Sequence, residues 1–424
     1  MRVLLISANR EEINMATWPL GTNLVAEAAR AAGYETRVLD LMHCDDPDEE
    51  LRDTIREFEP RVLGVSVRNI DDQSMEGTQF FVDQVRPVVD VCRSVSEAPI
   101  VLGGAGYSIF PQSCLEYLAA DMGIQGEGEM AFTALLASLE RKDDLGGIPG
   151  LHLPGRTAQE TRVFPRNLDE FPLPRPSACL ISRYTPGEFW LPVQTRRGCP
   201  MDCSYCSTGT IEGRLLRKRA PARVVQWLSD WVKEGVRRFH FVDNTFNLPK
   251  SYAREVCDRI VEAGLDITWR CIVYPSTIDE TLVRAMSRAG CSEVALGFES
   301  GSEAMLNSFH KHFAPGDVRR AAELFAAHGV RRMGFLLLGG PGETRQSVVE
   351  SLDFADSLKL DLVKLTVGIR IYPYTTLARQ AVEDGMVTAD DNLLQPRFYL
   401  TSGLDDWLRA TVAHWISTRR NWVR

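Results

Sequence analysis

Short apolar runs alternate with helical patterns along most of this chain, and this alternation constrains the fold more than any other feature. In the first 140 residues, the expected strands are Val3–Ala8, Glu35–Leu39, Arg61–Val67, Pro99–Leu102 and Asp121–Ile124. Between them lie helical patterns at Thr22–Ala32, Glu49–Phe58, Gly77–Val95, Gln112–Ala120 and Met130–Leu139. Such alternation favours right-handed β-α-β crossovers and a parallel sheet covered by helices on both faces. We therefore predict a flavodoxin-like or Rossmann-like α/β domain over residues 1–140.

The alternation resumes after a Pro- and Gly-rich stretch. Residues 141–190 show no sustained helical period and predict an ordered strap. The strands expected after the strap are Val193–Arg197, Arg237–Asp243, Ile267–Val273, Glu293–Glu299, Arg332–Leu338 and Leu362–Arg370. These repeats predict a partial (β/α)6 barrel over residues 191–383, with ligands at the carboxyl ends of the strands. Residues 384–424 predict a mainly helical C-terminal segment, whose aromatic residues either pack in a core or close the barrel mouth.

Three cysteines stand close together after the first strand of the predicted barrel. Cys199, Cys203 and Cys206 have the spacing C-x3-C-x2-C, and no fourth cysteine lies beside them. Three thiolates can hold a 4Fe-4S cluster by three irons and leave one iron open for an outside ligand. A structural zinc site is the alternative, but zinc takes four ligands at other spacings. The other seven of the ten cysteines are expected to be buried, inert thiols.

The amino-acid composition indicates which binding partners and which cellular compartment to expect. A formal net charge of -9 argues against a surface that binds nucleic acid. No apolar stretch is long enough to cross a bilayer, so no membrane span is expected. Met1 and Arg2 lead directly into a short buried strand, which is not typical of a secretory signal. We therefore expect a cytoplasmic protein with reduced cysteines.

The run from Cys199 to Cys206 resembles the signature of the radical S-adenosylmethionine (SAM) superfamily, in which the open iron chelates the amino and carboxylate groups of SAM. The resemblance implies SAM as a cofactor and places Tyr205 by the adenine. Glu299 and Ser300 would then bind the ribose and carboxylate of SAM. The remaining residues implied to bind SAM are Asp243 and Asn244, near its amino group, and Arg370, at the end of the sixth strand. Asp243 and Asn244 serve equally well as helix N-caps.

The first domain resembles the cobalamin-binding domain that precedes many radical SAM barrels. The resemblance is carried by Trp18-Pro19-Leu20-Gly21, by Gly103-Gly104-Ala105-Gly106 with Pro111, and by Gly126-Glu127-Gly128-Glu129. It implies that cobalamin is bound by Pro19, Gly21, Gly103, Gly104, Gly106, Gly126 and Glu127. Glycines at strand ends let a backbone approach a large ligand closely, although they also serve ordinary tight turns.

The histidine motif by which some corrinoid proteins bind cobalt is absent, and His43 is expected to be an exposed loop residue. The lower face of the cobalt would therefore meet the loop after the third strand, at Arg68 and Asn69. Arg68 carries a fixed positive charge and cannot ligate cobalt. A surface salt bridge to Asp71 or Asp72 is the alternative role for Arg68.

Together the two resemblances imply a cobalamin-dependent radical SAM enzyme with a 4Fe-4S cluster, SAM and cobalamin. Methyl transfer to an unactivated carbon of a small-molecule or natural-product intermediate is the expected reaction. Related enzymes also perform cyclisation, ring contraction or oxygen insertion, and these outcomes stay open. A corrinoid carrier or a methylthiotransferase is a further alternative. The resemblance also implies an electron donor such as flavodoxin or ferredoxin, and it leaves the catalytic residues unknown.

Overall fold

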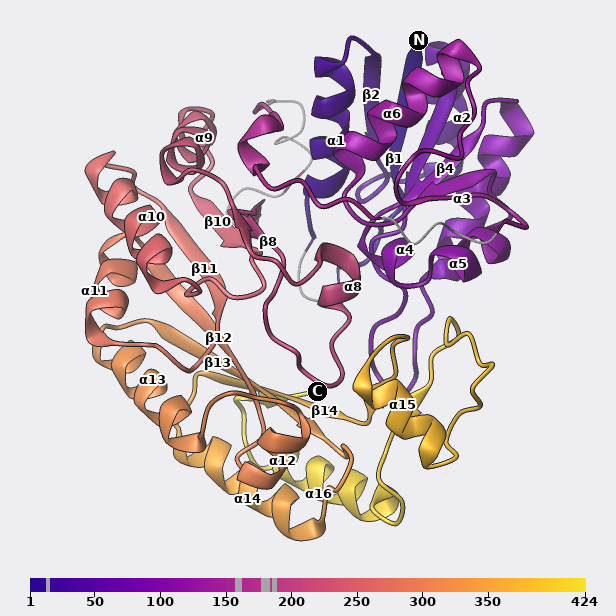
Figure 1. Ribbon diagram of the computed structural model, residues 1–424. Helices are drawn as coiled ribbons and strands as arrows, with labels where there is room; N and C mark the ends of the chain where they lie inside the picture. The colour runs from indigo at the N-terminus through magenta and orange to yellow at the C-terminus, as the bar shows by residue number, and fades with distance from the viewer. Residues whose placement is uncertain (13–15, 157–161, 177–183, 185–188) are drawn as a thin grey trace. The chain divides into compact units, whose positions relative to one another are not determined.

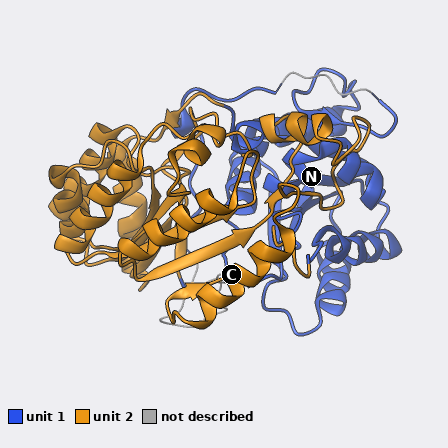
Figure 2. Cartoon of the chain, turned by 90° about the horizontal axis from the view of Figure 1, so that it is seen from below, with its two compact units in different colours: residues 1–72, 78–189, 207–213 blue, residues 73–77, 190–206, 214–424 orange. Residues whose placement is uncertain are grey.

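The computed structural model describes residues 1–12, 16–156, 162–176, 184 and 189–424 (Figure 1). The chain divides into two compact units (Figure 2). Unit 1 consists of Met1–Asp72, Thr78–Phe189 and Ser207–Gly213, and unit 2 of Gln73–Gly77, Trp190–Cys206 and Arg214–Arg424. The boundaries expected from the sequence, at residues 140, 190 and 383, stay a prediction. None of the described helices has the length and apolar character that crossing a membrane requires.

Unit 1 is built on one sheet with the strand order β2-β1-β3-β4-β5-β6. Its strands are β1 (Arg2–Ser7), β2 (Glu35–Asp40), β3 (Val62–Ser66), β4 (Ile100–Gly103), β5 (Met122–Ile124) and β6 (Leu151–His152). The strands from β2 to β5 in this order run parallel, which confirms the expected α/β domain. β6 comes from the predicted strap and pairs antiparallel with β5. A strand of two residues is too short to show a sequence pattern.

Helices cover both faces of this sheet. The helices of unit 1 are α1 (Leu20–Ala31), α2 (Pro47–Phe58), α3 (Val82–Val95), α4 (Ala105–Ile109), α5 (Pro111–Leu118), α6 (Gly128–Arg141) and α8 (Thr208–Glu212), with a 3-10 turn η1 (Leu168–Glu170). α1 packs beside α6, and α2 packs beside α3 (Figure 1). Val3 and Leu5 of β1 belong to the core under α1 and α6, together with Phe132. Leu4 and Ile6 alternate to the opposite face and are equally buried, which explains the unbroken apolar run of this strand.

A short excursion separates β3 from α3. A bridge between Asp71 and Phe80 closes its base, and the tip at 73–77 belongs to unit 2. There Glu76 forms ion pairs with Arg409 and Arg424. The helix expected from Gly77 therefore begins only at Val82, because these long-range contacts hold the intervening residues in a loop.

Unit 2 contains an open sheet with the order β17-β14-β13-β12-β11-β10-β7. Its strands are β7 (Leu191–Val193), β10 (Arg238–Phe241), β11 (Thr268–Val273), β12 (Cys291–Glu299), β13 (Arg331–Leu338), β14 (Leu362–Val367) and β17 (Trp422–Val423). Every neighbouring pair runs parallel, and this confirms the partial barrel. The C-terminal segment contributes a long helix, as expected, and also the edge strand β17.

Most helices of unit 2 form an outer layer along this sheet, whereas α15 lies apart from it (Figure 1). The helices of unit 2 are α9 (Pro221–Lys233), α10 (Lys250–Glu262), α11 (Glu280–Arg288), α12 (Glu303–Ser308), α13 (Pro315–Ala327), α14 (Arg345–Ser357), α15 (Thr376–Glu383) and α16 (Asp405–Ser417). Two strands expected as single elements are broken. β8 (Arg196–Arg197) and β15 (Ile369–Arg370) leave the main sheet and pair antiparallel with β9 (Arg217–Lys218) and β16 (Phe398–Tyr399).

Candidate functional site

The three clustered cysteines lie on one loop whose two ends are joined. β8 precedes the loop and β9 follows it, and their ladder pairs Arg196 with Lys218 and Arg197 with Arg217. Gly198 has a φ of +86°, in the left-handed region that glycine adopts without strain, where the chain leaves β8. The ladder therefore closes the base of the loop that carries Cys199, Cys203 and Cys206, which we call the cysteine loop (198–216).

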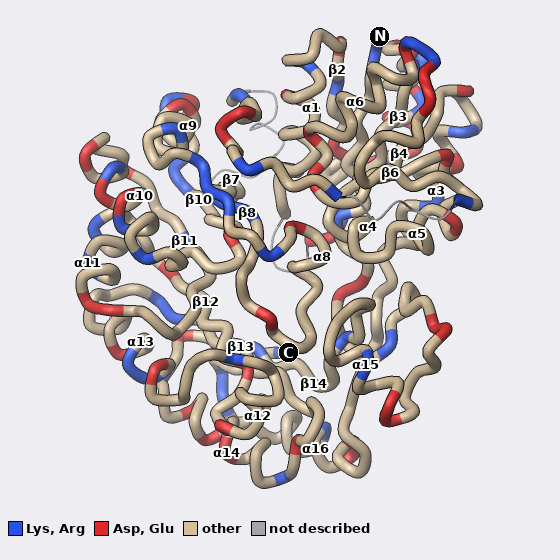
Figure 3. Tube along the Cα trace, in the orientation of Figure 1, with Lys and Arg blue, Asp and Glu red and all other residues tan. Residues whose placement is uncertain are grey.

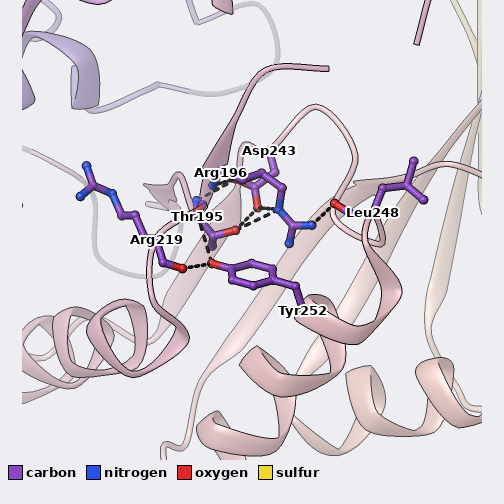
Figure 4. A network of polar contacts seen from close by, with 6 residues as sticks. All are labelled: Thr195, Arg196, Arg219, Asp243, Leu248 and Tyr252. Atoms are coloured by element: carbon purple, nitrogen blue, oxygen red, sulfur yellow. Dashed lines mark hydrogen bonds and ion pairs between the residues drawn. The ribbon is translucent and has the colours of Figure 1, made fainter. Parts of the chain in front are cut away.

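A buried carboxylate turns the chain out of the main sheet into this loop (Figure 4). Asp243 Oδ1 accepts hydrogen bonds from the backbone N–H groups of Thr195 (2.7 Å) and Arg196 (3.1 Å). Asp243 Oδ2 accepts from the Thr195 hydroxyl (2.6 Å) and lies 3.3 Å from Arg196 Nε. Burial raises the pKa of Asp243, whereas Arg196 lowers it. Because these amides bond to the carboxylate, β7 ends at Val193 instead of continuing as predicted.

Tyr252 ties this carboxylate network to the other end of the loop (Figure 4). Its hydroxyl donates to the carbonyl of Arg219 (2.7 Å), and its ring lies 4.6 Å from the Arg196 guanidinium carbon. The Arg219 N–H donates to the Thr195 carbonyl (2.9 Å). Arg196 also donates to the carbonyl of Leu248. Both ends of the cysteine loop are thus anchored to β10 and α10 in the interior of unit 2.

The middle of the loop is held by two other segments of unit 2. The N–H of Ser204 donates to the Phe309 carbonyl (3.1 Å), and its carbonyl accepts from the N–H of Leu377 (2.8 Å). His312 Nε2 lies 2.8 Å from Asp202 Oδ1, and this contact is the main cause of the lowered pKa of Asp202. The cysteine loop is therefore positioned at its base and at its centre.

The three thiols lie within electrostatic range of one another. Burial raises the pKa of Cys203 to about 11, Lys311 opposes the rise, and Cys206, Glu299 and Cys199 add to it. Within the described residues, no three Cys, His, Asp or Glu side chains already stand at metal-ligand spacing. The donor set still fits an iron–sulfur cluster, because it offers three thiols on one anchored loop and no fourth cysteine beside them.

The remaining described cysteines are buried, as predicted from the sequence. They are Cys44, Cys92, Cys114, Cys257, Cys271 and Cys291. Burial raises the pKa of Cys92 and of Cys114 to about 12, which keeps these thiols protonated and inert. Cys179 lies outside the described residues.

Two of the residues predicted to bind SAM meet at a lysine that the sequence analysis missed. Glu299 ends β12 with a φ of +66°, a left-handed conformation that is strained for a residue with a side chain. Its Oε1 lies 3.5 Å from Lys311 Nζ, and Lys311 Nζ lies 5.4 Å from the centroid of the Tyr205 ring. The available signal was the basic run from His310 to His312 shortly after a strand end.

The other predicted SAM contacts are engaged with the protein itself. Ser300 Oγ lies 2.7 Å from Ser351 Oγ. The Arg370 guanidinium donates to the carbonyls of Ile371 (2.7 Å) and Leu393 (2.8 Å). Asn244 is half-buried beside Asp243. Ser300, Arg370 and Asp243 hold backbone and neighbouring side chains in place, and their contact with a cofactor stays a prediction.

In unit 1, the predicted cobalamin contacts gather at the carboxyl ends of β3, β4 and β5. Gly104 has a φ of +104°, and a Cβ there would lie 2.6 Å from the Val67 carbonyl oxygen. A Cβ on Gly106 would lie 3.1 Å from the carbonyl oxygen of Arg68, which accepts the Gly106 N–H at 2.9 Å. These glycines bring the turn after β4 against Arg68 and Asn69. Open space surrounds Gly103, where a Cβ would meet nothing within 4 Å.

The turn after β5 joins the same edge. The N–H of Gly126 donates to Ser108 Oγ (2.9 Å), which links this turn to α4. Glu127 is the N-cap residue of α6, and Pro19 is the N-cap residue of α1. Gly21 lies in the first turn of α1 with open space around its Cα.

The cobalt-facing loop predicted from the sequence carries an exposed cation. Arg68 is exposed, and it forms no ion pair with Asp71, Asp72 or any other residue that the structure describes. His43 is exposed, as expected, and its ring meets the edge of Tyr184 at 4.7 Å.

Comparisons with known proteins agree with this arrangement. The sequence model of the B12 binding domain matches residues 6–136, and that of the radical SAM superfamily matches residues 193–355. An uncharacterized methyltransferase of Pyrococcus horikoshii is 28% identical over 399 residues, which cover 91% of this chain and 84% of that protein. Tryptophan 2-C-methyltransferase of Streptomyces laurentii is 27% identical over 454 residues, covering 91% and 76%. The structure of the radical S-adenosylmethionine methyltransferase TsrM from Kitasatospora setae, with cobalamin and a [4Fe-4S] cluster bound, has the same fold. It aligns with a TM-score of 0.85 and 22% identity, covering 100% of this chain and 90% of that one.

Proposed function

Because this chain is a radical SAM protein with an N-terminal B12 binding domain, we propose that it is a cobalamin-dependent methyltransferase. Its substrate would be a small molecule, such as a natural-product intermediate, that accepts the methyl group at an unactivated carbon. The observation that carries the proposal is the presence in one chain of a three-cysteine loop and a glycine-lined strand edge typical of a large ligand. Both sequence relatives described above are methyltransferases, which supports methyl transfer over cyclisation.

Each part of the site has a defined task under this proposal. Cys199, Cys203 and Cys206 hold the cluster, and the bound cluster, SAM and cobalamin supply the radical and methyl-transfer chemistry. Asp243 fixes the direction in which the cysteine loop leaves the sheet. Tyr205 contributes an aromatic face for the adenine of SAM.

Glycine residues and Arg68 of unit 1 would form the binding site for cobalamin. Gly104 and Gly106 remove side chains from the carboxyl edge of the sheet, so the corrin can approach the backbone. Arg68, which cannot ligate cobalt, would contribute a positive charge to the site of the bound cobalamin. Gly126 and Glu127 at the start of α6 would contact the same ligand.

The radical chemistry also requires an electron donor, and the protein requires a reducing cellular compartment. We infer a low-potential one-electron donor such as flavodoxin or ferredoxin, and a cytoplasmic location. Both acidic and basic residues occur along the outer helices α10, α11 and α13 (Figure 3), and this mixture does not favour nucleic acid as a partner of these helices.

The deciding experiment follows the methyl group and the fate of SAM. Full-length protein reconstituted under anaerobic conditions is incubated with deuterated methyl-SAM, a reductant and candidate substrates. Each labelled product should accompany one 5′-deoxyadenosine and one S-adenosylhomocysteine. A converted product without label would eliminate methyl transfer, and 5′-deoxyadenosine without S-adenosylhomocysteine would indicate a cyclase or ring-contracting enzyme. A variant with all three loop cysteines changed to alanine is the matched control and should release neither nucleoside.

A further inference from the structure

Lys311 is buried, which is rare for a lysine unless its charge is paired. Its side chain is 6% exposed, and the Glu299 side chain beside it is 16% exposed. The Lys311 Nζ lies 3.5 Å from Glu299 Oε1 and 3.4 Å from the carbonyl oxygen of Gly297. Burial opposes the charge, but Tyr205 and Glu299 raise the pKa of Lys311 well above its usual value. Lys311 and Glu299 therefore form a buried pair of opposite charges at the carboxyl end of β12.

The segment that carries Lys311 is bonded to the cysteine loop on either side of the lysine. The Phe309 carbonyl accepts the N–H of Ser204 at 3.1 Å. His310 Nδ1 lies 3.2 Å from the Asp202 carbonyl oxygen, and His312 Nε2 lies 2.8 Å from the Asp202 carboxylate. The position of Lys311 relative to the cysteines is therefore fixed by the fold and does not depend on a bound ligand.

Lys311 also lies beside the aromatic residue of the cysteine loop. Its Nζ is 5.4 Å from the centroid of the Tyr205 ring, and Tyr205 stands between Cys203 and Cys206 in the sequence. The buried pair of Lys311 and Glu299 is therefore adjacent to the part of the loop that carries two of the predicted cluster ligands. The basic run from His310 to His312 is visible in the sequence, but its pairing with Glu299 is not.

We propose that Lys311 is a positioning residue whose charge, balanced by Glu299, sets the reduction potential of the cluster held by the cysteine loop. The site gains one negative charge when a low-potential donor supplies one electron, and no proton moves. A fixed ammonium nearby stabilises that added charge, and a fixed carboxylate opposes it. The inference rests on the proposed function, because it requires a cluster on the three cysteines.

The expected size follows from Coulomb's law. Two unit charges about 10 Å apart in a medium of effective dielectric constant about 20 change an equilibrium by roughly tenfold. For a one-electron couple, a tenfold change corresponds to about 59 mV. Lys311→Met should therefore lower the potential of the cluster by about this amount, and Glu299→Gln should raise it by a similar amount.

The test is a redox titration of the full-length reconstituted protein without SAM, followed by electron paramagnetic resonance of the reduced cluster. The double variant Lys311→Met with Glu299→Gln should return close to the wild-type potential, because both charges are removed together. Lys311→Arg should keep the wild-type value, because the charge is retained. Lys233→Met is the matched control, since Lys233 is 65% exposed and pairs with Asp230 at the end of α9.

Unchanged potentials in both single variants, or shifts of the same sign, would overturn the inference. If the Lys311→Met variant cannot hold a cluster, the Glu299→Gln variant decides the question alone. A cluster reduction potential in Glu299→Gln that equals the wild-type value or lies below it then refutes the proposal. The two proposals fail differently. A wild-type protein that binds no iron refutes the proposed function. A fully bound cluster whose reduction potential is the same in wild type and in both single variants refutes only the role of Lys311.

Discussion

Replacing Asp243 with asparagine should destabilise unit 2 and impair cluster binding. The carboxylate is fully buried and serves two backbone amides, the Thr195 hydroxyl and the Arg196 guanidinium. The asparagine amide nitrogen cannot accept the Thr195 hydroxyl proton, and Arg196 loses its counter-charge. Removal of one partner from a buried ion pair costs about 3–5 kcal/mol. At about 2–4 °C per kcal/mol for a unit of this size, the melting temperature should fall by about 6–20 °C.

Two measurements check this reasoning. Thermal unfolding of the full chain, followed by circular dichroism, reports the stability, and iron per chain after anaerobic reconstitution reports the cysteine loop. Tyr252→Phe removes the hydroxyl that donates to the carbonyls of Arg219 and Thr195 in the same network, but it leaves no buried charge unpaired and should cost only about 1 kcal/mol. Asp230→Asn alters an exposed ion pair on α9 and should be nearly neutral. Wild-type stability and iron content in Asp243→Asn would refute the idea that this carboxylate anchors the loop.

Three further results are expected. Changing all three cysteines of the loop to alanine should abolish the roughly four irons of a 4Fe-4S cluster, and full iron content in that variant would disprove the ligand assignment. Gly104→Ala should cost about 1–3 kcal/mol and weaken cobalamin binding in a spectroscopic titration, because its Cβ would lie 2.6 Å from the Val67 carbonyl oxygen. Gly147→Ala, which meets nothing within 4 Å, is its control. Arg419 lowers the pKa of Asp356, so this pair stabilises the fold above the unfolded pKa of Asp356 and loses its effect as the pH falls through the folded value. Asp356→Asn, which leaves the stacking of Arg419 on Trp415 in place, should therefore cost less than about 1 kcal/mol near pH 7. Acid-unfolding curves should show this difference shrink once the pH falls below the folded pKa of Asp356.

Local sequence patterns were sufficient to predict the strands and helices that have buried faces. The apolar run of β1 predicted a strand buried on both sides, and the alternation of such runs with helices predicted both parallel sheets. The spacing of Cys199, Cys203 and Cys206 predicted that one loop carries all three thiols, as the structure shows, and their role as cluster ligands stays a prediction. These features depend on neighbours in the chain, so the sequence alone determines them.

Long-range packing decided the details that no local pattern shows. Asp243 follows a strand, and a carboxylate there looks the same in sequence whether it faces a cofactor or the amides of Thr195 and Arg196. Only the fold brings those amides to Asp243, ends β7 early and turns the chain into the cysteine loop. In the same way, only the fold buries Lys311 against Glu299, because the partner of a buried charge is set by which segments pack together and not by their distance along the chain.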